Sequence, residues 1–368
     1  MDVERQDDAS GAPVRDTRPF HPATLPFIRQ RAARLEAEQR LDYTAFVLSV
    51  TDRCNIKCDF CCHPYLDSEI AEADALRLVR EARALDFDEI GITGGEPFLR
   101  RALLVRMAAL AREAGMEFGV ISNGYWAKTP ARAQALLGEL VDAGLTRLTI
   151  SWDPSHGAYV PAATAQNAID AAIGLGIRAC LTGSFREPEA RHDDFGFRLA
   201  DHRLYRNFIE ANGLVAPAGK GADLADLPTG GGVDFAVSDG RCPARRLKQL
   251  VLYARGGLTQ PCCSIYAGYK ARGLSMGDWR DTPLADLRMR HRGDPYLTMI
   301  GEGGIKRVYA VIAEADPALA ARLPDPAASR DVCALCAKLM TGRLGPAVRS
   351  AIDGHMQTRL ADLLAAID

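Results

Sequence analysis

Three cysteines early in the chain have the spacing of an iron–sulfur motif. Cys54, Cys58 and Cys61 follow the pattern C-x3-C-x2-C, so three thiolates can converge from one short loop. Thiolates are the usual ligands of iron–sulfur clusters, and three of them leave one iron of a 4Fe-4S cluster open to a small chelating molecule. The alternative is a structural zinc site. Zinc sites usually have two pairs of ligands, whereas these three cysteines stand alone and an aromatic residue, Phe60, precedes the third.

A glycine-rich turn lies further along the chain, at Gly94-Gly95-Glu96-Pro97. Glycines let backbone amide and carbonyl groups approach a ligand closely, and Glu96 can accept a hydrogen bond from an ammonium group. Taken alone, such a sequence is more often only a turn. The turn indicates a ligand-binding site only if it lies next to the cysteine loop.

A second group of cysteines lies near the C-terminus. It comprises Cys242, Cys262, Cys263, Cys333 and Cys336, and four of these could fill a second 4Fe-4S cluster. A zinc site from the same residues is the alternative, because spacing alone does not distinguish zinc from iron–sulfur ligation. Structural disulfides are a poor account of ten cysteines in a chain of this size that we expect to be cytoplasmic.

Repeated strand–helix units must position these residues. Short β-branched runs predict strands at 46–50, 89–93, 118–122, 147–151, 178–182 and 214–216. Apolar residues at helical intervals predict helices at 72–85, 101–114, 130–143 and 162–174, several of which stop at a glycine. The pattern indicates an α/β fold, a partial parallel (β/α)6 barrel with a smaller C-terminal domain. Parallel barrels form their active sites at the carboxyl ends of the strands.

Polar residues follow several of these strands. Ser122-Asn123 ends the third strand, and Ser151-Trp152-Asp153 ends the fourth, so hydroxyl, amide and carboxylate groups share one rim. Arg186 follows the fifth strand and could pair with a carboxylate or form a surface ion pair. His156 is a candidate substrate contact or proton acceptor, with an ordinary loop histidine as the alternative. For Ser151 and Asp153 the alternative is a helix cap.

The cysteine loop and the Gly-Gly-Glu turn together resemble the radical S-adenosylmethionine (SAM) superfamily. The superfamily motif is C-x3-C-x-aromatic-C, followed one strand later by a Gly-Gly-Glu segment that binds the methionine part of SAM. The resemblance implies that Cys54, Cys58 and Cys61 hold a 4Fe-4S cluster. It also implies a SAM pocket, whose expected members are Phe60, Gly94, Gly95, Glu96, Ser122, Asn123, Ser151, Asp153 and Arg186.

The C-terminal cysteines resemble the twitch and SPASM extensions of radical SAM enzymes. Those extensions combine a cysteine, a glycine-led hairpin ending in cysteine, and a terminal C-x2-C pair around an auxiliary 4Fe-4S cluster. SPASM proteins usually carry seven such cysteines, so the five present here fit the shorter twitch form. The resemblance implies ligation by Cys242, Cys262, Cys333 and Cys336, and leaves Cys263 outside the ligand set.

Composition and segment boundaries complete the interpretation. Residues 1–42 are expected to be an extension with a possible helix at 27–40, 43–235 the barrel, 236–340 the auxiliary cluster domain and 341–368 a C-terminal helix beginning near residue 348. Lys and Arg total 45 against 47 acidic residues, so nothing favours a nucleic-acid partner. The acidic start lacks a signal peptide, and no apolar run is long enough for a membrane span, so we expect a cytoplasmic protein.

The resemblance implies an enzyme that cleaves SAM reductively to a 5′-deoxyadenosyl radical, which takes a hydrogen atom from the substrate. An electron donor such as flavodoxin or ferredoxin is implied as a partner. A fully ligated auxiliary cluster favours dehydrogenation of a small polar metabolite, such as a sugar or aminocyclitol. Epimerisation would need a hydrogen donor, for which Cys263 and then Cys180 are candidates, although Cys180 also fits a small core residue. The alternatives are a peptide-modifying enzyme and a non-catalytic iron–sulfur or zinc module.

Overall fold

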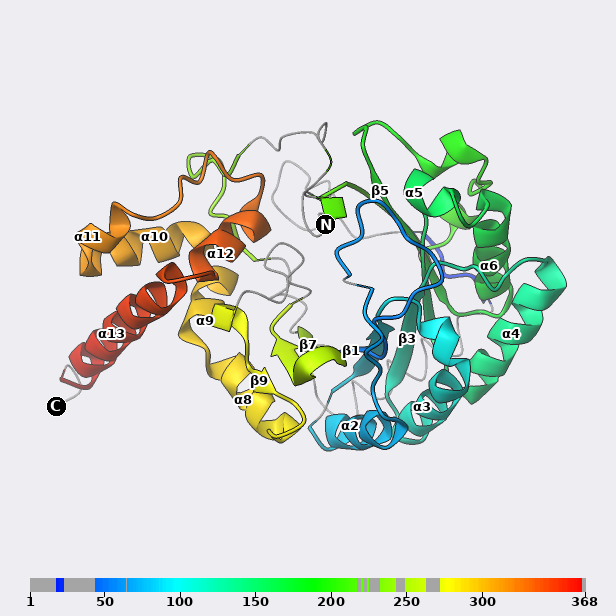
Figure 1. The fold of residues 1–368 in the computed structure, drawn as a ribbon, viewed down its shortest axis with the longest axis horizontal. Coiled ribbons are helices and arrows are strands. Elements are labelled where there is room, and N and C mark those ends of the chain that lie inside the picture. Colours follow the sequence, from blue (N-terminus) through cyan, green and yellow to red (C-terminus); the bar gives the residue numbers. More distant parts are fainter. Residues whose placement is uncertain are drawn as a thin grey trace. The chain divides into compact units, whose positions relative to one another are not determined.

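The computed structural model describes residues 18–22, 44–63, 65–85, 87–216, 220–221, 224, 232–242, 249–262 and 272–365. The chain divides into two compact units (Figure 1). The first comprises Met1–Leu227 together with Tyr253–Arg255, and the second comprises Pro228–Leu252 and Gly256–Asp368. The chain therefore returns to the first unit for three residues in the middle of the second.

The first unit is built on a parallel sheet. Within the described residues its six strands run in the order β6-β5-β4-β3-β2-β1. Their bounds are β1 Ala45–Ser49, β2 Glu89–Thr93, β3 Glu117–Ser122, β4 Arg147–Ser151, β5 Arg178–Phe185 and β6 Phe208–Leu214. This is the mixed α/β fold with a parallel sheet that the alternating pattern predicts, consistent with a partial barrel.

The sixth strand is where the strand prediction is wrong. The structure places β6 at Phe208–Leu214, whereas the sequence pattern indicates 214–216. Glu210, Asn212 and Gly213 interrupt the run of β-forming residues, so intrinsic preference does not mark this segment as a strand. It forms because it pairs in register with β5 along seven positions, from Ala179 opposite Phe208 to Phe185 opposite Leu214.

Helices cover the outer face of this sheet, as Figure 1 shows for α2, α3, α4 and α6. Their bounds are α2 Glu72–Ala84, α3 Arg101–Glu113, α4 Pro130–Ala143 and α6 Ala162–Gly174. The helices and the strands both contribute fully buried apolar side chains, for example Met107 of α3 and Phe118 of β3. Burial of this apolar surface is the main stabilising contribution to the unit.

The inner face of the sheet carries ion pairs at the amino ends of the strands. Arg147 donates through Nε to Glu89 Oε1 at 2.8 Å, and Arg178 pairs with Glu117. A Cβ on Gly119 would lie 2.8 Å from the Arg147 guanidinium, so the glycine leaves the space that this side chain occupies. These charges line the end of the sheet opposite to the one that carries the predicted motifs.

The second unit has an antiparallel meander followed by helices. Strand β7 (Gln249–Tyr253) pairs with β8 (Leu258–Gln260), which pairs with β9 (Gly277–Asp278). The helices are α8 Leu284–Gly293, α9 Pro295–Glu302, α10 Gly304–Ala315, α11 Pro317–Ala320, α12 Val332–Met340 and α13 Leu344–Ala365.

The sequence pattern indicates few helices in this region before the final one, and that expectation is wrong. The sequence signal that could have identified three of these helices is an aspartate at the N-cap position. Asp294, Asp316 and Asp331 each accept a hydrogen bond from a backbone N–H three residues later. Two of these aspartates precede a proline, which is well suited to the first helical position. The last helix begins at Leu344, four residues before the position expected.

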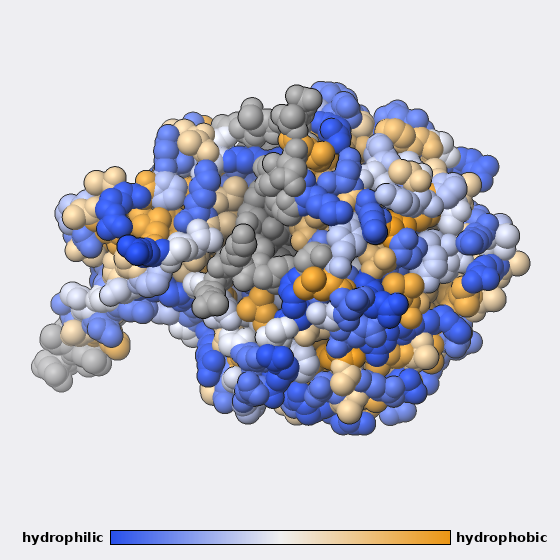
Figure 2. Space-filling model, viewed as in Figure 1, coloured by the Kyte–Doolittle hydropathy of each residue, from blue (hydrophilic) through white to orange (hydrophobic). Residues whose placement is uncertain are grey.

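The helix expected at 27–40 lies outside the described residues, as does most of the glycine-rich stretch 219–232. In the described parts of the chain, no helix combines the length and the apolar character that crossing a membrane requires. Polar side chains cover much of the face shown in Figure 2, with apolar residues in small groups between them.

Candidate active site

The loop after β1 brings the first three cysteines together. Cys58 is buried with Ile56 and Val160, and Cys54 and Cys61 pack against this small cluster. The pKa of Cys54 is raised to about 11 and that of Cys58 to about 12, mainly by burial, and neighbouring thiols of the same loop contribute to both shifts. Three closely spaced thiols in apolar surroundings ionise readily only when a cation is present, as it is in an iron–sulfur cluster.

Among the described residues, no three His, Cys, Asp or Glu side chains form a site for a single metal ion. The thiolates of a 4Fe-4S cluster bind separate irons, so they surround a larger volume instead of meeting at one point. The cysteine loop fits a cluster of this kind. The backbone N–H of His63 also donates to Cys61 Sγ at 3.4 Å, which is a contact that stabilises charge on a ligating sulfur.

The Gly-Gly-Glu turn after β2 is hydrogen-bonded to the cysteine loop. The N–H of Gly95 donates to Thr51 O at 2.7 Å, and the N–H of Glu96 donates to Arg53 O at 2.8 Å. A Cβ on Gly95 would lie 2.1 Å from Arg53 O, so only glycine permits this approach. The turn and the loop, which are far apart in sequence, are therefore held as one structure.

Glu96 is the best-defined polar group of this site. It is fully buried and accepts from the N–H of Phe98 at 2.9 Å, from Ser122 Oγ at 2.9 Å and from the N–H of Asn123 at 2.8 Å. Burial raises the pKa of Glu96 to about 7, although these hydrogen bonds oppose the shift. Oε2 receives only the Asn123 donor among the described residues, so its second lone pair fits an ammonium donor.

Ser122, which ends β3, and Asn123, which follows it, have different surroundings. Ser122 Oγ donates to Glu96 and accepts from the N–H of Gly124 and from Trp126 Nε1. A hydroxyl has one donor and two acceptor positions, so in this arrangement Ser122 has none left for a ribose. Asn123 instead reaches the cysteine loop, where its Nδ2 donates to Asn55 Oδ1 at 3.0 Å.

Asp153, after β4, has the position of a helix cap. It is 2% exposed and accepts from the N–H groups of Ser155 and His156, which follow Pro154 in the short helix α5 (Pro154–Gly157). Its other oxygen accepts from the N–H of Ser184 in β5 at 3.2 Å. Asp153 therefore ties α5 to the end of β5. Ser151 is partly exposed at the end of β4.

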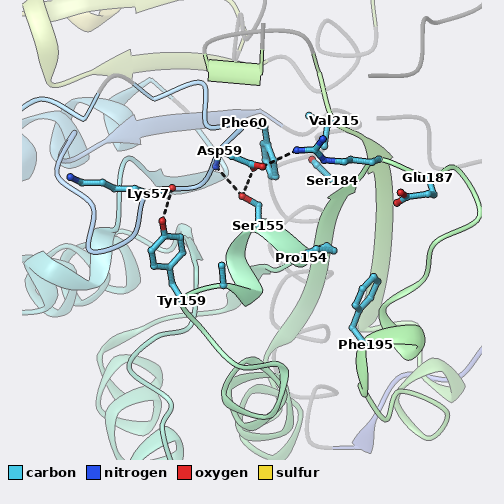
Figure 3. Close-up of a pocket in the computed structure, with 12 residues that line it drawn as sticks. Lys57, Asp59, Phe60, Pro154, Ser155, Tyr159, Ser184, Glu187, Phe195 and Val215 are labelled. Carbon is cyan, nitrogen blue, oxygen red and sulfur yellow. Dashed lines mark hydrogen bonds and ion pairs between the residues drawn. The ribbon is translucent and has the colours of Figure 1, made fainter. Parts of the chain in front are cut away.

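A cavity of about 500 Å³ opens beside α5 and the end of β5 (Figure 3). Asp59, between two of the cysteines, accepts from Ser155 Oγ at 2.5 Å and from Arg186 Nη2 at 2.9 Å. Arg186 is thus paired on the surface with a residue of the cysteine loop. The cavity is lined by Lys57, Asp59, Phe60, Pro154, Ser155, Ala158, Tyr159, Ser184, Arg186, Glu187, Phe195 and Val215.

Two of the predicted catalytic residues belong to this unit. The His156 ring lies 6.0 Å from the Phe60 ring between centroids, and its Nδ1 is 2.9 Å from Asp153 Oδ1. His156 therefore lies near the predicted SAM pocket. Cys180 lies in β5 on the same face as Ser184, opposite Thr149 and Ile209, and burial raises its pKa to about 11. Cys263 lies outside the described residues.

The C-terminal cysteines of the second unit gather around Cys336 in α12. Burial is the main reason that the pKa of Cys336 is raised, and Cys262, Cys242 and Cys333 are all close enough to add to the shift electrostatically. The other three expected auxiliary ligands thus lie close enough to Cys336 to act on it electrostatically, and their ligation of a cluster stays a prediction. The buried Tyr296 donates from its hydroxyl to Cys336 Sγ at 3.0 Å.

Sequence reasoning missed three residues of these sites. Asp59 and Ser155 lie within the motifs, and their polar character was an available signal. Tyr296 had none, because it is far from every cysteine in the sequence and meets Cys336 only through packing of α9 on the rest of its unit.

A parallel sheet with a three-cysteine loop after its first strand and a Gly-Gly-Glu turn after its second defines a radical SAM domain. Residues 48–159 match the family model of the Radical SAM superfamily, so this part of the chain is similar to that superfamily. Its members use SAM and a 4Fe-4S cluster, which are the cofactors that the cysteine loop and Glu96 fit.

Several known proteins are similar to the chain. A GTP 3′,8-cyclase of Synechococcus sp. (strain CC9902) is 41% identical over 118 residues, which cover 31% of this chain and 33% of that protein. The chain thus spans a third of the length of this relative. A GTP 3′,8-cyclase of Klebsiella pneumoniae is 27% identical over 278 residues, covering 70% of this chain and 80% of that protein. Among solved structures, BtrN in complex with AdoMet and 2-DOIA matches 71% of this chain and 88% of its own, with 16% identity and a TM-score of 0.43.

Proposed function

We propose that this radical SAM enzyme oxidises a small polar metabolite by two electrons, with an auxiliary 4Fe-4S cluster as the acceptor of the second electron. The observation that carries the proposal is that Cys242, Cys262 and Cys333 all lie close enough to Cys336 to raise its pKa electrostatically. Four thiolates complete the ligation of a 4Fe-4S cluster and leave no iron open to substrate. A cluster of that kind is suited to electron transfer.

In the first unit, Cys54, Cys58 and Cys61 would hold the other cluster. Once bound, that cluster and SAM supply a 5′-deoxyadenosyl radical, which removes one hydrogen atom from the substrate. Glu96 would accept a hydrogen bond from the SAM ammonium through Oε2. The cavity beside Phe60 and Ser184 would take an aromatic or sugar portion of a ligand and exclude water from it.

Oxidation also requires that a proton leave the substrate. His156 is our candidate acceptor, because its ring lies beside Phe60 and its Nδ1 lies 2.9 Å from Asp153 Oδ1. Epimerisation would require a thiol donor instead. Cys180 shares the inner face of β5 with Ser184, so it is the candidate that the described chain offers.

Cyclisation of a purine nucleotide is the second candidate, because relatives named GTP 3′,8-cyclase match the chain. A triphosphate needs several cations for its recognition. In the cavity Lys57 and Arg186 are accompanied by Asp59 and Glu187, and Arg186 is already paired with Asp59, so this cavity is not strongly cationic. The charge balance therefore favours a less charged substrate. A peptide substrate is a further alternative, and flavodoxin or ferredoxin remains the proposed electron donor.

The test is anaerobic reconstitution followed by incubation with SAM and dithionite. We expect about eight irons per chain, and 5′-deoxyadenosine formation that increases with an aminocyclitol or sugar but not with GTP. A GTP-dependent increase would favour the cyclase. About four irons would remove the auxiliary cluster, and the absence of 5′-deoxyadenosine with every substrate would contradict the enzymatic role.

A further inference from the structure

Tyr296 lies in the first turn of α9 and is 1% exposed. A buried tyrosine hydroxyl normally needs a hydrogen-bond partner, since leaving it unpaired away from water is unfavourable. The partner of Tyr296 is a sulfur, Cys336 Sγ, at 3.0 Å. The phenol therefore directs its only proton at one of the four gathered thiols.

The position of Tyr296 is fixed by several contacts of α9. Asp294 caps the helix by accepting from the N–H of Leu297 at 2.9 Å, and Arg349 of α13 donates to the same aspartate at 2.7 Å. At the other end of α9, Ile300 O accepts from the N–H of Cys242 at 2.9 Å. One short helix thus holds both a hydroxyl aimed at Cys336 and the backbone of Cys242.

A sulfur that ligates iron keeps lone pairs and carries negative charge, so it accepts a hydrogen bond more strongly than a neutral thiol does. Reduction from [4Fe-4S]²⁺ to [4Fe-4S]⁺ adds one electron, and part of that charge resides on the thiolates. A donor to a thiolate therefore stabilises the reduced state more than the oxidised one. The phenol keeps its proton throughout.

We infer that Tyr296 is a positioning residue that raises the reduction potential of the auxiliary cluster through its hydrogen bond to Cys336. The inference rests on the auxiliary cluster proposed above. Its consequence is that a single side-chain oxygen sets how readily the cluster accepts an electron from the substrate.

The test uses Tyr296→Phe in the full chain, reconstituted with iron and sulfide. This change removes one oxygen and retains the ring. Tyr309→Phe is the matched control, because Tyr309 lies in the same unit and donates to Pro324 O, a backbone oxygen, and not to a thiol. Iron content and an electron paramagnetic resonance redox titration are measured for both variants and for the wild type.

We expect Tyr296→Phe to retain the wild-type iron content while its auxiliary cluster titrates at a more negative potential, and Tyr309→Phe to leave the potential unchanged. An unchanged potential in Tyr296→Phe would overturn the inference. Loss of the iron in Tyr296→Phe alone would also overturn it, because the hydroxyl would then be needed for assembly. If the reconstituted wild-type protein holds no iron at the C-terminal cysteines, the proposed auxiliary cluster itself is contradicted. That outcome is distinct from an unchanged potential in Tyr296→Phe.

Discussion

The two thiol sites of this chain are assembled in different ways. Cys54, Cys58 and Cys61 come from one loop, whose shape is fixed by hydrogen bonds to the neighbouring Gly-Gly-Glu turn. The C-terminal site draws on residues from 242 to 336, on several elements of a second unit. The first site is therefore defined locally, whereas the second exists only when its whole unit is folded.

The hydrogen-bond donors to sulfur also differ between the two sites. At the first site the backbone N–H of His63 donates to Cys61, and the side chain of Asn123 donates through Nδ2 to Cys54 Sγ at 4.0 Å. At the second site the donor to Cys336 is the side chain of Tyr296. A single substitution can therefore remove the Tyr296 contact, whereas the contact from the His63 backbone is kept by every residue except proline.

The largest effect is expected from Cys58→Ala, which removes the most deeply buried ligand of the first site. Reconstituted protein should fall from about eight irons to about four per chain, and 5′-deoxyadenosine formation should fall to background. Iron analysis and chromatography of the reaction check this. The control is Cys62→Ala, which should behave as wild type because Cys62 lies outside the motif. Retention of eight irons in Cys58→Ala would contradict the assignment.

Cys336→Ala should remove about four irons from the other site while leaving SAM cleavage in place. The variant should still form 5′-deoxyadenosine, but little oxidised product, because the second electron has no acceptor. The two cysteine variants would then separate the two sites cleanly. Oxidised product at the wild-type ratio to 5′-deoxyadenosine would show that the second site does not accept the electron.

Glu96→Gln should weaken SAM binding by about 10- to 150-fold, because hydrogen bonds to a charged group contribute about 1.5–3 kcal/mol. The reconstituted protein should keep its iron. Equilibrium binding of SAM measures the effect. An affinity within twofold of wild type would remove Glu96 from the SAM pocket.

The same residue predicts a pH dependence. The pKa of Glu96 in the folded protein, about 7, lies above its ordinary value of 4.5. Without SAM, the contribution of Glu96 to stability is complete below pH 4.5 and is lost as the pH rises to about 7. SAM binding should strengthen over the upper part of that interval as the carboxylate ionises. Glu96→Gln should show neither trend in thermal unfolding and binding measurements.

The smallest effect is expected from Cys180→Ala. If the reaction is an oxidation, no thiol is needed as a hydrogen donor, and product formation should change less than about twofold while stability falls by about 1 kcal/mol. Kinetics and urea unfolding test both values. A lost or altered product would point to epimerisation.

The sequence predicts some elements of the first unit to the residue and misplaces another. Strands β2 and β4 and helices α4 and α6 lie at the predicted bounds, since their apolar periodicity and their end signals agree. For α4 those signals are Thr129 as the cap and Gly144 after the last turn. The bounds of strand β6 were predicted wrongly, because this segment becomes a strand through its pairing with β5 and not through its own composition.

The contacts of individual side chains could be predicted less well. A carboxylate such as Asp153 can cap a helix or bind a ligand, and only the geometry shows the cap. Ser122 has the residue type expected at a ribose site, yet packing places it against Glu96 and Trp126. The contact between Tyr296 and Cys336 joins two distant helices, so no local pattern encodes it.

The return of Tyr253–Arg255 to the first unit affects how the protein can be cut or recombined. The N–H of Ala254 donates to Ser49 O at the end of β1, immediately before the cysteine loop. A truncated chain that stops near residue 228 would leave that carbonyl without its donor at the edge of the catalytic domain. Chimaeras that exchange the C-terminal unit with another radical SAM enzyme should therefore retain residues 253–255, although those residues lie within the segment being exchanged.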